Sequence, residues 1–465
     1  MGSSEGISYR PGRCPPANNG RGLTRALTNC GAPMHPSHVI RGRATQLLTG
    51  RKIVVGVSGS IAAVEVPRII RELIRHGADV RAVMSPEAGR IISAEALEFA
   101  TGHPPVVQLT GNVEHVTLLG PGEGQADLYL IAPATANTIA KIAHGIDDTP
   151  VTSCASVALG GEVPMLIAPA MHAHMASNPA IRESLDKLRS WGVGIVLGAS
   201  VEGEEKIATP EETAAAVLHR IARGPWAGHP VVVIGGASRE SIDSVRSVSN
   251  ESSGETAVSI ATQAFFRGAE VTLWAGAMEV PVPSWIPVER WRGVADLIAL
   301  ARRERSRLAE ARAVFVPAAL SDFTLDRMPG KIPSRDRETL TLTLHRAPKA
   351  LPELRRLAPP PACLVAFKLL VGAQVAELEA GARELTEETH ADWVVANDVA
   401  VMGGHDANAL VVPRGGERRW IRGPKAEFAG KLLDDIGRET MSLASSSVPR
   451  RQGEHRRRRL RPRRS

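Results

Sequence analysis

The stretch KIVVGVSGSIAAVEVPRIIRELIRHGADVRAVM, residues 52–84, decides the fold of the first half of the chain. KIVVGV is a short run of apolar and β-branched residues, which is typical of a buried strand, and it ends in the turn SGS. IAAVEVPRIIRELIRHG then carries apolar residues at helical spacing, and ADVRAVM predicts a second strand. Because a helix joins the two strands, we expect them to lie parallel in one sheet.

The strand-then-helix pattern recurs along the chain. In residues 49–222, DLYLIAP with ATANTIAKIAHG, and VPMLIAP with the residues after it, repeat the pattern. Glycine and proline cluster in RIARGPWAGHP, residues 220–230, and mark a domain boundary. The pattern starts again with VVVIGG and continues through residues 229–440. We therefore predict an α/β protein of two Rossmann-like, three-layer domains, the second with an inserted β-hairpin at residues 331–348.

Composition restricts the class of protein. The chain has 465 residues, of which 43% are hydrophobic and 23% charged, as is usual for a globular protein. Its apolar runs are too short for a membrane span, and four scattered cysteines favour a reduced, cytoplasmic setting. We expect residues 1–48 to be a flexible basic leader and residues 441–465 a disordered Arg-rich tail.

The tail accounts for the positive charge of the chain. RRQGEHRRRRLRPRRS, residues 450–465, holds nine arginines and one glutamate, whereas the whole chain has a net charge of +7. The remainder is therefore close to neutral. Such a tail makes nonspecific contacts with phosphates, and basic patches interleaved with aromatic residues are missing from the sequence. A nucleic-acid enzyme is not indicated.

At two strand ends the residues have the composition of a site that binds a phosphate or a flat ring. The first turn places Ser58, Gly59 and Ser60 between a strand and a helix, where backbone N–H groups suit a phosphate. APATANTIAKIAHG, residues 132–145, brings small residues and hydroxyl groups to another strand end, as a flat ring with a phosphate arm requires. The structural alternatives are a plain tight turn and a helix that Thr135 N-caps.

PAMHAHM, residues 169–175, raises the question of a metal site because His172 and His174 lie two residues apart. No third ligand follows nearby, so the pattern is weak support for a tetrahedral metal ion. A substrate loop and the start of a helix are the other interpretations. The metal content of the chain stays unknown at this level.

Several motifs, taken in order, resemble one family. GSIAA, VEHVTL, APATANTIAKIAHGIDD and PAMHAHM are similar to motifs of the flavodoxin-like decarboxylases that bind flavin mononucleotide (FMN), specifically 4'-phosphopantothenoylcysteine decarboxylase. SIDSVRSVSNESSG, AALSDF, GKI, VAFK and ANDVAVMGG resemble phosphopantothenate–cysteine ligase. From about residue 40 to about residue 440 the chain thus resembles archaeal-type bifunctional proteins of coenzyme A biosynthesis. The resemblance implies CTP-dependent ligation of 4'-phosphopantothenate with cysteine, then FMN-dependent decarboxylation to 4'-phosphopantetheine.

For the first domain the resemblance implies a histidine base and a bound flavin. His115, in VEHVTL, matches the active-site histidine that takes the thiol proton, and an imidazole suits this role near neutral pH. FMN takes up and returns the hydride equivalent that the decarboxylation requires. The residues expected to contact FMN are Gly59, Ser60, Ile61, Ser85, Thr135 and Asn137.

Two departures from the family pattern concern the substrate. The common motif has asparagine where this chain has His172, which is expected to hold the substrate carboxylate or amide, with Met175 retained nearby. Bacterial-type relatives carry a cysteine in the flap that follows, whereas GASVEGEEKIATPEE, residues 198–212, has none. Lys206 lies near that position and is either a proton donor or a solvated charge.

For the second domain the resemblance implies an acyl-nucleotide intermediate, which needs cations, Mg²⁺ and donors to the developing oxyanion. Arg246 and Asn250 match positions that hold this intermediate, and Lys331 matches the lysine that stabilises the activated acyl phosphate. Asn397 and Asp398 are either ligand contacts or turn residues. The helix before them lacks the two lysines that are frequent in the family. The choice between CTP and ATP as the nucleotide therefore stays open. The expected nucleotide-binding residues are Gly235, Gly236, Asp322, Lys331, Phe367, Asn397 and Asp398.

Three other functions are compatible with the first domain. They are an FMN decarboxylase of another cysteine-containing substrate, a prenyl-flavin-type transferase and a non-catalytic regulatory flavoprotein. The attached ligase domain argues against the first two, and the presence of His115, Asn250 and Lys331 argues against the third. The family builds its decarboxylase site between subunits, which implies a homo-oligomer with small-molecule substrates and no membrane partner.

Overall fold

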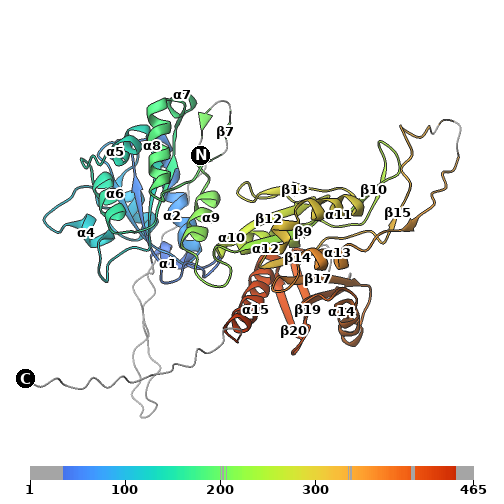
Figure 1. Ribbon diagram of the computed structural model, residues 1–465. Helices are drawn as coiled ribbons and strands as arrows, with labels where there is room; N and C mark the ends of the chain where they lie inside the picture. The colour runs from blue at the N-terminus through green and yellow to red at the C-terminus, as the bar shows by residue number, and fades with distance from the viewer. Residues whose placement is uncertain are drawn as a thin grey trace, which may run out of the picture.

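The computed structural model describes residues 35–198, 200–201, 204–205, 207–333, 335, 338–398 and 404–446. These residues form two α/β domains, blue to green and yellow to red in Figure 1. Each domain has a mainly parallel sheet between two layers of helices, so the predicted fold class is confirmed. In the described part of the chain, none of the helices is long and apolar enough to span a membrane.

The first domain is built on a five-stranded parallel sheet in the order β2-β1-β3-β4-β6. The interior strand β1 is buried except for its first residue, and Ile53 lies opposite both Val80 and Leu128. Continuous apolar runs of this kind are required in strands that helices cover on both faces. The strands are β1 (Lys52–Val57), β2 (Asp79–Met84), β3 (Leu128–Ala134), β4 (Met165–Pro169) and β6 (Gly194–Ile195).

Helices cover both faces of this sheet. Apolar residues of α2, α3 and α9 pack on one face, and those of α5, α6 and α8 pack on the other. The helix predicted after β1 begins as a 3-10 turn because Ser60 caps Ala62, and it becomes α-helical only from Val66. The helices are α1 (Pro36–Ile40), η1 (Ile61–Glu65), α2 (Val66–Arg75), η2 (Ala88–Arg90), α3 (Ala94–Thr101), α4 (Glu114–Leu119), α5 (Ala136–Ala143), α6 (Pro150–Gly160), α7 (Ala173–Ala176), α8 (Pro179–Ser190) and α9 (Pro210–Ile221).

A second, small sheet joins the PAMHAHM motif to the flap. Strand β5 (Met171–His172) pairs antiparallel with β8 (Glu204–Glu205), which pairs with β7 (Ser200–Val201). His172 lies opposite Glu204 in this register. The two segments that the resemblance relates to substrate binding are therefore neighbours in space.

The second domain has an eight-stranded sheet in the order β13-β12-β9-β14-β17-β18-β19-β20. The first six strands are parallel, and β19 and β20 continue the sheet antiparallel. The strands are β9 (Pro230–Gly235), β12 (Glu270–Ala275), β13 (Val288–Arg290), β14 (Ala313–Val316), β17 (Cys363–Leu370), β18 (Trp393–Asp398), β19 (Asp406–Pro413) and β20 (Arg419–Pro424).

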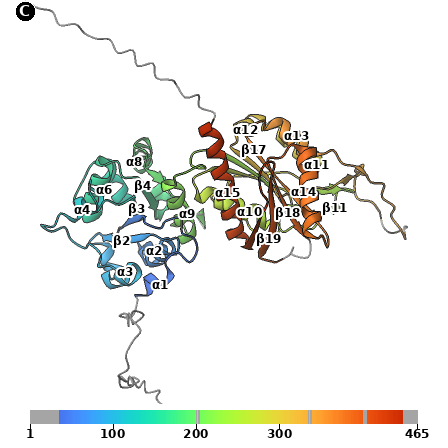
Figure 2. The same cartoon turned by 90° about the horizontal axis from the view of Figure 1, so that it is seen from below.

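Figure 2 shows α10 and α15 on one side of this sheet and α11, α13 and α14 on the other. Two separate apolar clusters correspond to these two layers. Trp226 lies in the first cluster and donates its indole N–H to the carbonyl of Leu433 (3.1 Å). The helices are α10 (Glu255–Phe266), α11 (Val294–Arg303), α12 (Arg305–Glu310), α13 (Ala350–Leu357), α14 (Val375–Thr389) and α15 (Lys425–Ser446).

Two short antiparallel pairs extend from the second domain, and one of them differs from the predicted hairpin. Strand β10 (Arg239–Ser241) pairs with β11 (Ser247–Ser249), and β15 (Phe323–Thr324) pairs with β16 (His345–Arg346). The partner of β16 thus lies before residues 331–348, not within them. The described residues of the Thr-Leu run at 339–344 form no strand, because no neighbouring strand is in register with them.

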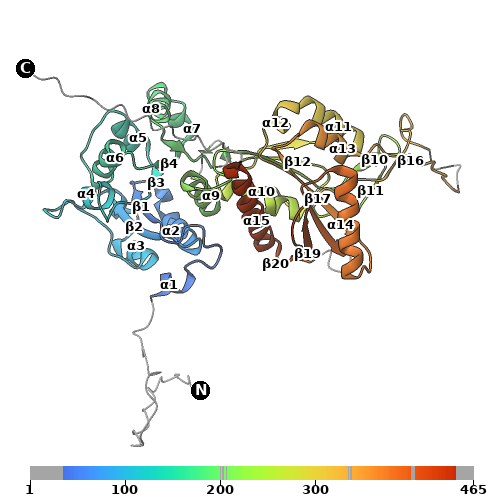
Figure 3. The same ribbon diagram turned by 60° about the horizontal axis from the view of Figure 1, so that its bottom comes forward.

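The two domains meet where α9 lies beside α10 (Figure 3). The ring of His219 stacks on Phe265 with 4.3 Å between centroids, and its Nδ1 lies 3.1 Å from the carbonyl oxygen of Phe265. His76 contacts the next ring, that of Phe266, edge to face at 5.5 Å. Histidines of the first domain thus contact two consecutive aromatic residues of the second.

Candidate active sites

A buried serine holds the turn after β1. Ser58 donates through Oγ to the carbonyl of Pro133 (2.7 Å) and accepts the N–H of Thr135 (3.0 Å). Gly59 permits a close approach to the next loop, because a Cβ atom here would lie 2.4 Å from Cβ of Glu87. The ends of β1 and β3 therefore meet at the carboxyl edge of the sheet, where ligands of parallel sheets bind.

Three predicted FMN contacts cap helical turns. Ser60, Ser85 and Thr135 each accept a backbone N–H of the turn that follows. The interpretation of Thr135 as an N-cap is thus confirmed. A hydroxyl group that accepts one N–H keeps its own proton for donation, so the caps do not prevent contact with a phosphate or a ring carbonyl. Asn137 is exposed in the first turn of α5.

A cavity of about 610 Å³ opens beside this turn. Ser60 and Ile61 line it from the turn, His172 lines it from β5, and residues 207–211 line it from the start of α9. Its volume lies in the range of small-molecule sites. The side chain of Ile61 is 78% exposed and gives the entrance an apolar surface. Of the predicted residues, the structure unites Ser60, Ile61 and His172 here.

His115 is placed elsewhere in the domain. It lies on α4, which Figure 1 shows at the outer edge of the domain, away from α9, and it does not line the cavity. Its Nδ1 atom is buried and has no hydrogen-bond partner among the described residues. Buried polar atoms are usually paired, so an orphaned acceptor of this kind is a candidate for a functional contact.

The described residues of the flap do not identify the side chain that donates the last proton of the decarboxylation. Lys206 lies outside the described residues, and Met175 is 49% exposed on α7 without lining the cavity. The described cysteines Cys154 and Cys363 are both free thiols in the cores. Burial raises the pKa of Cys154 to about 12 and also raises that of Cys363. Neither thiol is suited to replace the flap cysteine of the relatives.

In the second domain, glycines make room at the end of β9. A Cβ atom on Gly235 would lie 2.1 Å from Cβ of Ala257 on α10. Gly236 has φ +84°, and Gly254, with φ +78°, is the N-cap of α10. The helix N-terminus therefore approaches the strand end closely, and the side chain of Met278 packs against all three glycines.

Asp243, which the motif analysis did not include, organises the next loop. Its carboxylate accepts the N–H groups of Val245 (2.7 Å), Arg246 (2.7 Å) and Ile332 (3.0 Å). Backbone hydrogen bonds, that of Arg246 first, lower the pKa of Asp243 to about 2. The loop of Arg246 is thereby tied to the segment of Lys331, so two predicted sites are brought together. The only signal in the sequence was an acidic residue inside SIDSVRS.

The loop after β14 carries Asp322 and also contacts Asn250. The amide of Asn250 donates to the carbonyl of Leu320 (3.1 Å), two residues before Asp322. Asp322 forms an ion pair with Lys349 (3.0 Å), and both side chains are more than half exposed. Exposed ion pairs contribute little to stability, so these charges remain available to a ligand. Lys349 was not predicted.

Asn397 and Asp398 have different surroundings, although they are neighbours on β18. Asp398 accepts the N–H groups of Gly372 (3.1 Å) and Ala373 (2.7 Å), as a turn residue does. The Oδ1 atom of Asn397 is buried without a partner among the described residues, which favours the ligand interpretation. Phe367 is partly buried against the core on the adjacent strand.

Two arginines at the carboxyl edge were missed. Arg239 and Arg292 line a cavity of about 210 Å³ beside Gly276 at the end of β12. Guanidinium groups bind phosphates and carboxylates well. The signal in the sequence was weak, because neither arginine belongs to a motif.

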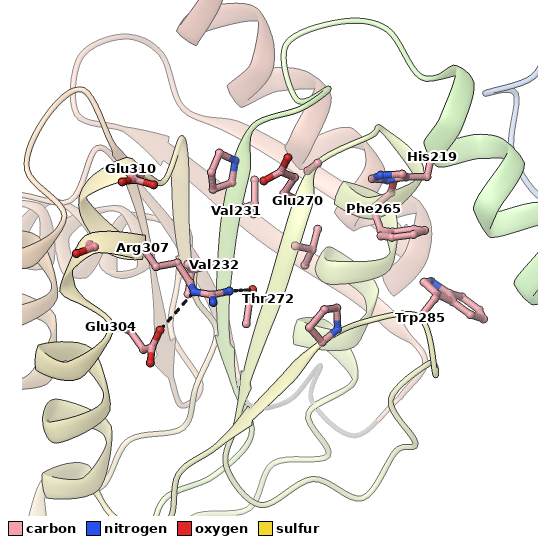
Figure 4. Close-up of a pocket in the computed structure, with 15 residues that line it drawn as sticks. His219, Val231, Val232, Phe265, Glu270, Thr272, Trp285, Glu304, Arg307 and Glu310 are labelled. Carbon is pink, nitrogen blue, oxygen red and sulfur yellow. Dashed lines mark hydrogen bonds and ion pairs between the residues drawn. The ribbon is translucent and has the colours of Figure 1, made fainter. Parts of the chain in front are cut away.

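Figure 4 shows a cavity of about 600 Å³ at the opposite, amino end of β9 and β12. Aromatic side chains, among them Phe265 and Trp285, line one side of it. Arg307, ion-paired with Glu304 (3.5 Å), lines the other side. The cavity contains none of the predicted site residues.

The metal interpretation of PAMHAHM finds no support. Within the described ranges, no group of three or more His, Cys, Asp or Glu side chains is arranged to hold a metal ion. The rings of His172 and His174 stack on each other, with centroids 5.0 Å apart.

Comparisons with known proteins match both domains. Residues 41–222 match the family model "Flavoprotein", and residues 226–439 match that of the "DNA/pantothenate metabolism flavoprotein C-terminal domain". The crystal structure of the FMN-dependent cysteine decarboxylase SpaF is 33% identical to this chain, covers 37% of it and 99% of SpaF, and has a TM-score of 0.32.

Two relatives span nearly the whole described chain. The coenzyme A biosynthesis bifunctional protein CoaBC of Thermococcus kodakarensis is 40% identical over 405 residues, which are 87% of this chain and 99% of that protein. The protein of the same name from Methanocaldococcus jannaschii is 34% identical over 407 residues, 87% of this chain and 97% of its own. The chain therefore belongs to the family of coenzyme A biosynthesis bifunctional proteins, CoaBC.

Proposed function

We propose that the two domains divide the chemistry of this bifunctional enzyme of coenzyme A biosynthesis. The second domain joins 4'-phosphopantothenate to cysteine with CTP, and the first domain decarboxylates the product to 4'-phosphopantetheine. The observation that carries this division is that predicted residues of each activity, among them Ser60 and Thr135 in the first domain and Gly235 and Asn250 in the second, lie at the carboxyl edges of two separate sheets. Each edge is the ligand-binding edge of its own domain.

The first site has features that fit FMN, the cofactor of this flavoprotein family. Gly59 lets the loop of Glu87 pack directly against the turn after β1, and the hydroxyl groups of Ser60, Ser85 and Thr135 lie at the strand ends. When bound, FMN supplies the uptake and return of a hydride equivalent. The serine hydroxyl groups would hold the bound cofactor through hydrogen bonds, and the apolar side chain of Ile61 would pack against it.

His115 is the proposed base for the thiol proton, because its Nδ1 atom has no hydrogen-bond partner among the described residues. The cavity that contains His172 lies in another part of the same chain. We therefore propose a homo-oligomer in which α4 of one subunit completes the cavity of the next. Exposed apolar side chains beside both halves support this interface; they are Ile61 and Val64 beside the cavity and Val113 and Val116 beside His115.

In the second domain the phosphates of CTP bind at the carboxyl edge of the sheet near Gly236, together with Mg²⁺, which usually binds through phosphates. The carboxylate of phosphopantothenate attacks the α-phosphate and releases pyrophosphate. Lys331 and Arg246 stabilise the negative charge that develops, and Asn250 orients the acyl group. The amine of cysteine then attacks the acyl carbon, and CMP leaves. Free thiols at Cys154 and Cys363 support a cytoplasmic location.

The test is a reconstitution with the purified chain. We expect a yellow protein with an FMN spectrum that converts 4'-phosphopantothenate, cysteine, CTP and Mg²⁺ into 4'-phosphopantetheine. Replacing CTP with ATP in a parallel reaction decides the nucleotide. Accumulation of phosphopantothenoylcysteine would show that the decarboxylase half is inactive, and a colourless protein would contradict the flavin site.

A further inference from the structure

His172 uses one ring nitrogen as a helix cap. Its Nδ1 atom accepts the N–H of His174 at 3.2 Å and so N-caps α7. The backbone of His172 is extended, with φ −63° and ψ 146°, as an N-cap residue requires. Only an unprotonated nitrogen can accept an N–H, so the proton of the capping ring lies on Nε2. The cap therefore selects one tautomer of the neutral ring.

Asn178 makes the same bond six residues later. Its Oδ1 atom accepts the N–H of Ala180 at 3.0 Å and caps α8, with φ −60° and ψ 126°. In both residues one atom accepts the N–H two positions ahead, and an N–H group of the same side chain remains free. A histidine that caps through Nδ1 is thus equivalent to a capping asparagine.

The ring of His174 adds a second restraint. It stacks on His172 with 5.0 Å between centroids and 29° between planes. A proton on Nδ1 of His172 would remove the cap and would place a positive ring against its stacking partner. Both contacts of residue 174 therefore restrain the orientation of the ring of His172.

Other charges also face His172. Glu65 and Arg68 line the same cavity from η1 and α2, and Glu211 lines it from α9. Carboxylates favour a positive ring, but Glu65 is ion-paired with Arg68 at 3.1 Å. The cap is the contact that distinguishes the two ring nitrogens.

We propose that the cap made with the backbone N–H of His174 orients the ring of His172, so that its Nε2–H is available to the carboxylate of the substrate. The proposal rests on the proposed role of His172 in substrate binding and says how that role is performed. His172 donates a hydrogen bond without giving up a proton, as the asparagine of other relatives does. No charge at this position is required.

Three substitutions of His172 separate the cap from the donor. Asparagine in H172N retains both, aspartate in H172D retains the cap acceptor without a donor, and glutamine in H172Q retains the donor on a side chain that caps poorly. We expect kcat/KM for decarboxylation of phosphopantothenoylcysteine to stay within about threefold of wild type in H172N, and to fall about tenfold to a hundredfold in H172D and H172Q. FMN content and ligase activity of the same preparations report on folding.

Each other pattern overturns the proposal. A loss in H172N as large as in H172D would mean that His172 must carry a charge or transfer a proton. Full activity in H172Q would mean that the cap is irrelevant. Wild-type activity in all three variants would remove His172 from the substrate site, while CO₂ release by the wild type would still support the proposed function.

A second measurement does not depend on turnover. ¹⁵N NMR of the FMN-loaded, histidine-labelled enzyme, with H172N used for assignment, reports the protonation of each ring nitrogen. We expect His172 to carry its proton on Nε2 alone at neutral pH, with or without substrate. His35, whose Nδ1 accepts the N–H of Ser37 (3.3 Å) far from the cavity, provides an internal reference. A proton on Nδ1 of His172 would overturn the proposal.

Discussion

Asp243 accepts the N–H of Ile332 at 3.0 Å and so connects two loops that are 89 residues apart in the chain. One loop carries Arg246, and the other carries Lys331. The side chain of Asp243 is fully buried, so its contacts are shielded from water. A single carboxylate therefore holds together two parts of the proposed ligase site.

Replacing Asp243 with asparagine tests this connection. D243N keeps the shape of the side chain but presents an N–H₂ group to N–H donors, so at least one contact is lost. We expect kcat/KM of the ligation to fall at least about tenfold. Decarboxylation of supplied phosphopantothenoylcysteine stays at the wild-type rate, because that site lies on the other domain. D434N, at an exposed aspartate paired with Arg267 (2.9 Å), is the matched control, and equal losses in both variants would contradict the prediction.

The same carboxylate predicts a pH dependence of stability. The pKa of Asp243 is about 2 in the folded chain, below its ordinary value of 3.8. A lowered pKa means that the contribution of Asp243 is fully present above about pH 4 and is lost as the pH falls toward about 2. We expect the melting temperature of the wild type to fall more steeply over this range than that of D243N. Parallel melting curves measured by circular dichroism would argue against it.

Gly59 is predicted to be required for the flavin site. A methyl group at this position meets Cβ of Glu87 at 2.4 Å, so G59A must displace the turn after β1. Overpacking of this kind costs about 1–3 kcal/mol. We expect a lower FMN absorbance per chain and a lower melting temperature. G160A serves as the control, since its Cβ atom has no neighbour within 4 Å; a flavin loss of the same size there would exclude a local effect.

The proposed subunit interface is testable by mixing inactive chains. H115N and H172D are each expected to lose at least about nine tenths of the decarboxylase activity, because each removes one half of the site. Co-expressed with different tags and purified as a mixed oligomer, they regain activity, because some cavities combine an intact His172 with an intact His115 of a neighbour. Mixed oligomers of two differently tagged H115N chains provide the blank. If both halves act within one chain, the mixture stays inactive while its ligase activity remains.

Strands, helices and turn glycines followed from local patterns. KIVVGV became β1 and VVVIGG became β9, because continuous apolar runs bounded by glycine have few other solutions in an α/β chain. The Thr-Leu run at 339–344 shows the limit of such patterns. A strand exists only if another strand pairs with it, and the described residues there have no such partner.

Motifs placed Ser60 and His172, which line one cavity of the first domain, while their roles in binding stay predictions. The hydrogen-bond partners of site residues were not predictable. No motif assigned a role to Asp243. The neighbours Asn397 and Asp398 differ in their hydrogen-bond partners, because the loop of Gly372 and Ala373 lies against Asp398. Hydrogen bonds of this kind depend on which loops share a sheet edge, and that is a long-range property.

The sequence by itself determined the two α/β domains, their order and the chemical type of each site, because periodicity, glycine turns and motif residues act over short distances. Only the tertiary structure decided that His115 lies apart from the cavity, that Asp243 joins two ligase loops and that His172 caps a helix through Nδ1. These results depend on the position and direction of individual donors and acceptors, which the packing of distant segments sets.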